Sequence, residues 1–125
     1  MRGGHVHRWA LAVMAAGGVL LGACDGKVAG GRADGAAVFA ETCARCHGPD
    51  GVPSRAMVAR LGVKDLTSAE VQALSDERIH SQIVNGSKNK QMPSFSYVLS
   101  EAQIEALIRY VRTLDDPHPA PTAAR

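Results

Sequence analysis

The sequence predicts an all-α protein built around one small domain. Apolar residues near the C-terminus recur at the i, i+3, i+4, i+7 spacing of an amphipathic helix, and Ser, Thr or Asp stands at each expected helix start. No segment shows a convincing alternation of apolar and polar residues, which is the pattern of a half-buried strand. Residues 34–114 lie between a Gly-rich stretch and a Pro-rich tail, and their length suits a single domain.

The N-terminal residues carry the features of an export signal. Arg2 and Arg8 flank a short polar start, and the uncharged apolar run over residues 9–21 is too short to cross a bilayer. This pattern indicates a secretory signal over residues 1–23 rather than a buried core helix. All 12 acidic residues follow that signal, so the exported chain is close to neutral and its charge does not point to nucleic acid.

The end of the signal, "LGAC" at residues 21–24, resembles the lipobox of bacterial lipoproteins. The resemblance implies cleavage before Cys24, lipidation of that cysteine, and a location on the periplasmic side of a bacterial membrane. The alternative is an ordinary signal cut near Ala23, which leaves Cys24 as a free thiol. Residues 24–33 are Gly-rich and predict a flexible tether, and residues 115–125 hold three prolines and predict a disordered tail.

Start and stop signals place the helices of the domain in chain order. A cap residue starts a helix by accepting a hydrogen bond from a free backbone N–H group. The expected helices are 35–46 after Asp34, a short one over 54–61, one headed by Thr67 and Glu70, one from Ser75 to Asn85 and Gly86, and a last one after Ser100 and Gln103. The chain has only one Trp, two Tyr and two Phe residues, which makes a thin core for a domain of about 80 residues. A domain this small usually needs a disulfide, metal or cofactor.

Two of the three cysteines stand together in "CARCH", as Cys43, Cys46 and His47. A redox dithiol would need a βαβ context, and a zinc site would need two more ligands where only His80 and His118 remain. A structural disulfide would leave His47 without a role. Covalent attachment of one haem c accounts for all three residues, because each thiol adds to a vinyl group and the adjacent imidazole reaches the iron.

A low-spin electron carrier needs a second axial ligand. The residues that could supply it in the exported chain are Met57, Met92, His80 and His118. Met92 stands in a loop before Pro93, whose fixed φ stiffens the backbone where a weak thioether ligand must be held. Phe95 could close the haem edge. We therefore expect His47 and Met92 to bind the iron.

The segments "CARCHG" and "MPSF" carry a resemblance to a known family. Through them, residues 34–114 resemble a class I cytochrome c of the small mono-haem bacterial type. The resemblance implies three to five helices wrapped around one covalently attached haem. In the family a glycine and an aromatic on the first helix pack against a leucine and an aromatic on the last. The matching residues here are Gly35, Phe39, Leu107 and Tyr110.

The sequence departs from the family at one point. Many members carry a proline beyond the haem motif whose carbonyl accepts the Nδ1–H of the haem histidine, whereas this chain has Lys64 and Asp65 before Leu66. We expect a carbonyl between residues 62 and 65 to orient His47.

The resemblance implies a monomeric electron carrier rather than an enzyme, passing single electrons between a redox protein donor and an acceptor. The lipid would bring it to membrane complexes, and it could equally be the electron-transfer subunit of an oxidoreductase. Lys88 and Lys90 either form a basic rim that steers an acidic partner or belong to an ordinary solvated loop. The alternative function is a haem-based sensor or binding protein for carbon monoxide or nitric oxide, with a labile Met92 bond.

Overall fold

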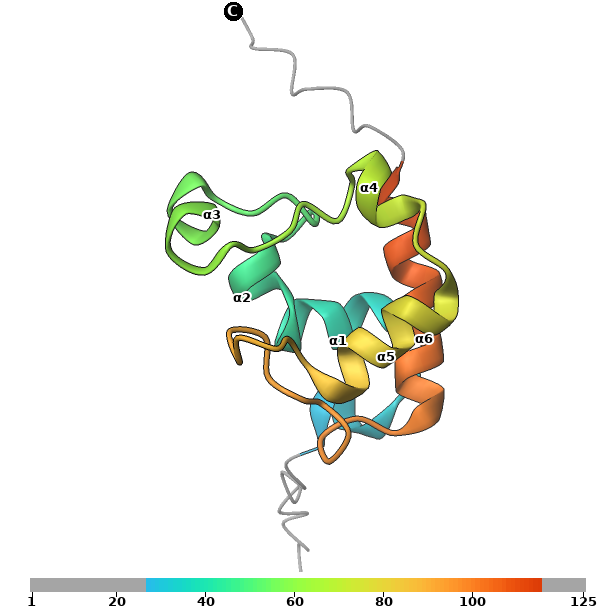
Figure 1. Cartoon of the computed structure of the whole chain (residues 1–125). Helices are drawn as coiled ribbons and strands as arrows, with labels where there is room; N and C mark the ends of the chain where they lie inside the picture. The colour runs from blue at the N-terminus through green and yellow to red at the C-terminus, as the bar shows by residue number, and fades with distance from the viewer. Residues whose placement is uncertain (1–26, 116–125) are drawn as a thin grey trace, which may run out of the picture.

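The computed structural model describes residues 27–115, and within them every regular element is helical (Figure 1). The elements are η1 (Val28–Gly31), α1 (Gly35–Thr42), α2 (Ala44–His47), α3 (Arg55–Leu61), α4 (Ala69–Gln72), α5 (Asp76–Asn85), α6 (Glu101–Arg112) and η2 (Thr113–Asp115). The all-α prediction is confirmed, and the four α-helices longer than a single turn fall within the expected three to five. The expected signal, Cys24, His118 and nearly all of the expected tail lie outside the described residues. Within the described range no helix has the length and apolar character needed to cross a membrane.

Local capping explains where most helices begin. Asp34, Ser54 and Ser75 each accept a hydrogen bond from the backbone N–H three residues later, as expected. Ser100 and Gln103 form the reciprocal capping box that their spacing predicts.

The expected start of α4 is wrong by one residue. Ser68, not Thr67, caps this helix by accepting a hydrogen bond from the Val71 N–H. Thr67 is occupied by Asp65, whose carboxylate accepts bonds from both its N–H and its hydroxyl group. The side chain of Thr67 is therefore engaged upstream, and the next hydroxyl along the chain takes the cap.

The helix expected over residues 35–46 is broken in two at Cys43. The Thr42 hydroxyl donates to the carbonyl of Val38 at 2.6 Å, a bond that bends helices because it competes with the backbone ladder. Cys43 itself has a φ of −110° and ends α1, and α2 starts at the next residue. Because of this break, the turn that carries the haem motif runs in a different direction from α1.

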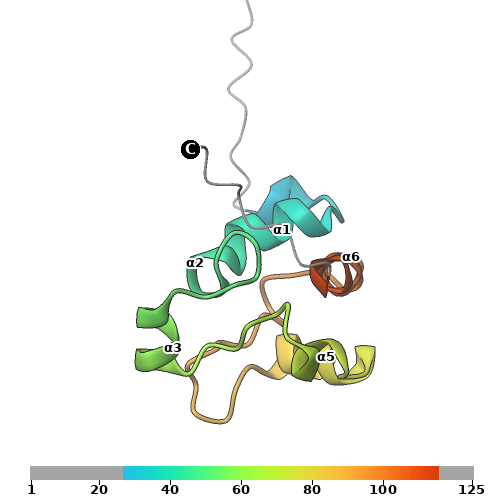
Figure 2. The same cartoon turned by 90° about the horizontal axis from the view of Figure 1, so that it is seen from above.

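The core lies where α1 crosses α6, and Figure 2 shows the two helices side by side. A Cβ atom at Gly35 would overlap the carbonyl oxygen of Ala106, so only glycine allows this approach of the two backbones. Phe39 and Leu107 are fully buried, and the Phe39 ring lies 5.1 Å from the ring of Tyr110. The expected contact between the first and last helices is confirmed.

Part of the segment expected to be a flexible tether is packed on the domain. The buried side chain of Gln103 donates to the carbonyls of Val28 and Arg32, and Glu41 accepts from the N–H of Ala29. Ala29 is buried in the core cluster. The packed structure therefore begins at about residue 28, earlier than the expected start at residue 34.

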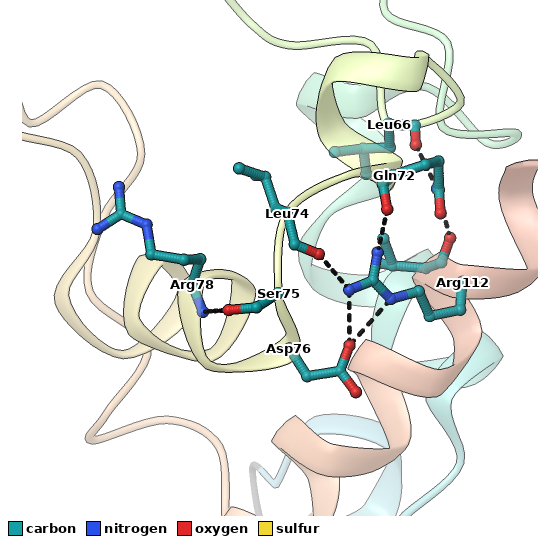
Figure 3. A network of polar contacts seen from close by, with 8 residues as sticks. Leu66, Gln72, Leu74, Ser75, Asp76, Arg78 and Arg112 are labelled. Carbon is teal, nitrogen blue, oxygen red and sulfur yellow. Dashed lines mark hydrogen bonds and ion pairs between the residues drawn. The ribbon is translucent and has the colours of Figure 1, made fainter.

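A polar network joins the end of α6 to the turn between α4 and α5 (Figure 3). The guanidinium of Arg112 donates to the carboxylate of Asp76 and to the carbonyls of Gln72 and Leu74. The Gln72 amide in turn donates to the carbonyls of Leu66 and Val111. These bonds hold the α4–α5 turn, which has no long helix of its own, against α6.

Candidate functional site

A cavity of about 600 Å³ lies between the α1–α6 pair and the rest of the described chain. Its walls are mainly apolar and come from α1, α4, α5, α6 and the segments between them, including Phe39, Leu66, Val71, Ile79, Ile83 and Leu107. Cys43, Cys46, His47 and Met92 all line it. The four site residues predicted from the sequence are thus brought together around one space.

The haem motif forms a single tight turn at the edge of the cavity. The N–H groups of Cys46 and His47 both donate to the carbonyl of Cys43, at 3.1 and 2.9 Å. Both cysteines are free thiols and are not joined as a disulfide. Burial raises the pKa of the Cys43 thiol and the nearby Cys46 adds to this, while its hydrogen bond with the Thr42 side chain opposes it.

His47 is oriented by a backbone carbonyl from the expected segment. Its Nδ1 lies 3.0 Å from the carbonyl oxygen of Lys64, so this nitrogen carries the proton and donates it. The Nε2 atom is then the unprotonated one. Burial lowers the pKa of His47, an effect that outweighs the hydrogen bond to Lys64, and this favours the neutral imidazole that binds metals. The carbonyl of Lys64 takes the part that a proline carbonyl plays in many class I cytochromes c.

Met92 is held at the base of a short closed loop. The Ser87 N–H donates to the carbonyl of Met92, and the Met92 N–H donates to the Ser87 hydroxyl, both at 2.9 Å. Gly86 lies so close that a Cβ atom there would be 2.8 Å from the carbonyl carbon of Pro93. The amide of Gln82 approaches the Met92 sulfur at 3.6 Å. The backbone on both sides of the thioether is therefore fixed.

Of the other candidate ligands, the two that the structure describes, His80 and Met57, do not line this space. His80 is hydrogen-bonded through Nε2 to the carboxylate of Glu101 at 2.7 Å, and it does not line the cavity. Met57 lies on α3 and is also absent from the cavity walls. In residues 27–115 no group of three or more His, Cys, Asp and Glu side chains is arranged to hold a metal ion.

Sequence reasoning missed two partners of the site residues. Gln82 lies one turn after the buried Ile79 on α5, and this spacing is the only feature of the sequence that could have pointed to it. The loop that carries Met92 begins after this helix, so no local pattern links the two residues. The Thr42 hydroxyl lies 3.3 Å from the Cys43 sulfur, and its position directly before the motif was the available clue.

The residues present fit a covalently bound haem. Two thiols and one imidazole lie on one turn, a thioether comes from a separate segment, and the cavity that they line is large and mainly apolar. Soft sulfur and imidazole donors suit iron in a low-dielectric pocket.

Comparisons with known proteins agree with this fit. The family described as cytochrome c oxidase, cbb3-type, subunit III matches residues 31–111. The chain is 35% identical over 82 residues to the cbb3-type cytochrome c oxidase subunit CcoP of Cereibacter sphaeroides, covering 66% of this chain but only 27% of that protein. It is 40% identical over 79 residues to cytochrome c6 of a Synechococcus species, covering 63% of this chain and 66% of that protein.

A solved structure gives the same result for the fold. The KustC0563 c-type cytochrome matches with a TM-score of 0.59 and 36% identity, covering 65% of this chain and 96% of that one. The protein belongs to the cytochrome c oxidase, cbb3-type, subunit III family, and it is a c-type cytochrome that carries haem covalently through Cys43 and Cys46.

Proposed function

We propose that the protein is a mono-haem electron carrier in which His47 and Met92 bind the iron and a lipid on Cys24 anchors the domain to a membrane. The observation that carries the ligand assignment is the lining of the cavity. Among the histidines and methionines of residues 27–115, His47 and Met92 are the two that contribute to its walls.

The bound haem supplies one-electron chemistry between the ferrous and ferric states. The chain's own residues set the conditions for that chemistry. The Lys64 carbonyl fixes the tautomer and ring orientation of His47 and makes the imidazole a stronger donor. The thioether of Met92 is a soft ligand that favours the reduced metal, so this ligand pair raises the reduction potential relative to two histidines.

Two features limit what else the site can do. The mainly apolar walls disfavour net charge inside the cavity, which also favours the reduced state. The fixed backbone around Met92 keeps the sulfur in position, as an electron carrier requires, because outer-sphere transfer is fast only when the ligands move little.

We further propose that a redox protein donates the electron and another accepts it, and that the domain works as a monomer on the periplasmic side of a bacterial membrane. Similarity to CcoP favours a membrane oxidoreductase as one partner, with this chain as a separate carrier or a dedicated subunit. Lys88 and Lys90 are exposed at the tip of the loop before Met92, where positive charge would steer an acidic partner.

The optical spectrum of the purified ferric protein tests the ligand assignment. A methionine sulfur bound to ferric iron gives a weak absorption band in the red, and we expect this band in the native protein. It should vanish in Met92→Ala and persist in the matched controls Met57→Ala and His80→Ala. A native spectrum without the band would refute the assignment and favour the sensor for small ligands or a second histidine ligand such as His80. A band that survives Met92→Ala would assign the sulfur to another methionine.

Mass spectrometry of the membrane-extracted protein tests the anchor. We expect an N-terminal Cys24 that carries diacylglycerol, and release of the Cys24→Ala variant from the membrane fraction. An unmodified thiol on Cys24 would end the lipoprotein proposal without affecting the ligand assignment.

A further inference from the structure

The turn over residues 96–99 presents two apolar side chains to solvent. Tyr97 is 98% exposed and Val98 is 53% exposed, although the neighbouring Leu99 is buried. The turn is not loose, because the N–H groups of Val98 and Leu99 both donate to the carbonyl of Phe95, at 3.0 and 2.9 Å. The backbone therefore holds the ring of Tyr97 away from the domain at a fixed place.

This turn lies beside the first described residues of the chain. A shallow surface hollow is lined by Val98 and Ser100 from the turn and by Lys27, Gly30 and Gly31 from the N-terminal segment. In Figure 1 the N-terminal segment and the loop before α6 lie at the lower end of the molecule, and α3 and α4 lie toward the other end.

The N-terminal segment is fixed to the domain at this end. Gln103, which is 4% exposed, donates to the carbonyls of Val28 and Arg32, and Glu41 accepts from the N–H of Ala29. Cys24 stands three positions before Lys27 in the sequence. Since a chain spans at most about 3.5 Å per residue, a lipid on Cys24 must enter the bilayer within about 10 Å of Lys27.

The chemistry of the turn suits a lipid surface at that distance. Tyrosine concentrates at the boundary between headgroups and acyl chains, where its ring is sheltered and its hydroxyl stays hydrated. Valine adds apolar area next to it. The charges near the hollow are of both signs, Arg32 and Glu101 among them, so attraction to anionic lipid is not the main contribution.

We propose that the turn around Tyr97 and Val98 is a membrane-contact face that works together with the Cys24 lipid, on which this inference rests. Tyr97 and Val98 enter the headgroup region of the same leaflet that holds the lipid. Two points of attachment, one covalent and one through the turn, hold the domain in one orientation, with α3 and α4 turned toward the aqueous side. The domain is then oriented on the membrane and does not swing on a long tether.

Photolabelling of the lipidated holoprotein in vesicles tests this face. The full-length protein is placed in phosphatidylcholine vesicles that contain a phosphatidylcholine with a diazirine group in its acyl chain, and labelled residues are located by mass spectrometry. We expect labels on residues 96–98, with α3 unlabelled. The variant Tyr97→Ser/Val98→Ser should lose about tenfold of the labelling in this turn, because about 1.4 kcal/mol of favourable apolar transfer is removed.

A matched pair on the opposite end gives the control. The variant Val52→Ser/Val58→Ser also removes two half-exposed apolar side chains, and it should leave the labelling of residues 96–98 unchanged. Labels spread evenly over the domain, or absent from the turn while Cys24 is acylated, would overturn the membrane face and assign the turn to a second copy or another protein. If Cys24 carries no lipid and the turn is unlabelled, both the anchor and this face are wrong, and the mass of the N-terminal peptide separates the two results.

Discussion

The α1–α6 pair and the region around α3 hold their structure in different ways. α1 and α6 pack directly on one another, and between them they bury Val38, Phe39 and Leu107 almost completely. α3 buries none of its residues, and Val58 on it is 48% exposed. The first region contains its own core, whereas the second faces a cavity of about 600 Å³ through the residues that follow it.

The difference identifies what stabilises each region. α3 is set by local signals alone, since Ser54 caps its start and Gly62 ends it in the left-handed conformation. Such a short helix is not stable by itself in water. Bonds at the two ends of the α3 region, Leu66 N–H to the Gly51 carbonyl and His47 to the Lys64 carbonyl, tie it to the domain. We expect the haem to supply much of its remaining stability, while the α1–α6 pair takes its stability from side chains.

Removing haem attachment should give the largest difference in stability between the two regions. We expect Cys43→Ser/Cys46→Ser to lose covalent haem and leave little cooperatively folded protein, because the cofactor supplies much of the core. Amide hydrogen exchange should show no protection in α3, with residual protection confined to α1 and α6. A stable helical apoprotein with protected α3 amides would contradict this contrast.

A side chain at the crossing of α1 and α6 should damage the self-supporting region directly. Gly35→Ala places a methyl group against the carbonyl of Ala106, so the helices must move apart. We expect a loss of about 3 kcal/mol in the free energy of unfolding, measured by denaturant titration. Ala40→Val adds volume to the exposed side of the same helix and should cost less than about 1 kcal/mol. Equal losses in the two variants would show that the crossing is not close.

The Arg112 network tests how the α1–α6 pair is joined to the α4–α5 turn, which follows the α3 region in the chain. Arg112→Met keeps the aliphatic stem but leaves the carbonyls of Gln72 and Leu74 without this donor. We expect the melting temperature to fall by an amount equivalent to about 2 kcal/mol, with faster exchange in the α4–α5 turn. Arg109→Met changes an exposed arginine on the same helix, and its effect should be within about 0.5 kcal/mol. If amide exchange in the α4–α5 turn is unchanged in Arg112→Met, the network does not hold this turn against α6.

The smallest effect is expected at the side chain of Lys64. It forms an exposed ion pair with Glu70 at 3.1 Å, whereas its carbonyl oxygen holds His47. Lys64→Ala should therefore change the stability by less than about 1 kcal/mol and leave the midpoint of a redox titration near that of the native protein. A large shift of the midpoint would mean that the charge, and not the carbonyl, acts on the site.

The features that could be predicted from the sequence are the local ones. The caps at Asp34, Ser54, Ser75 and Ser100 depend on residues three positions apart, so the helix starts follow from the sequence itself. The cap at Thr67 was wrong because Asp65, two positions earlier, engages that residue. Thr67 and Ser68 could both cap α4, and only the contacts in the structure show that Ser68 does so.

Of the non-local contacts, the crossing of α1 and α6 was expected from the family resemblance, and the others could not be predicted. The bonds of Gln103 to Val28 and Arg32 join residues more than seventy positions apart, so nothing in the Gly-rich stretch itself indicated that it would pack. For His47 the segment that supplies the carbonyl was predicted, but its identity as Lys64 depends on the path of the chain. Cys43, Cys46, His47 and Met92 line one cavity, and the roles of His47 and Met92 as iron ligands stay predictions.

The reciprocal hydrogen bonds between Ser87 and Met92 have a consequence for how such a protein can diversify. They close the loop at its base, and the tip is tied to the same hydroxyl, because Ser87 donates to the side-chain oxygen of Asn89, which also accepts from the Gln91 N–H. Lys88, Asn89 and Gln91 also line the cavity, whereas Lys90 does not. A change of recognition sequence that leaves the cofactor's surroundings and the placement of the sulfur intact is therefore confined to the outward position held by Lys90.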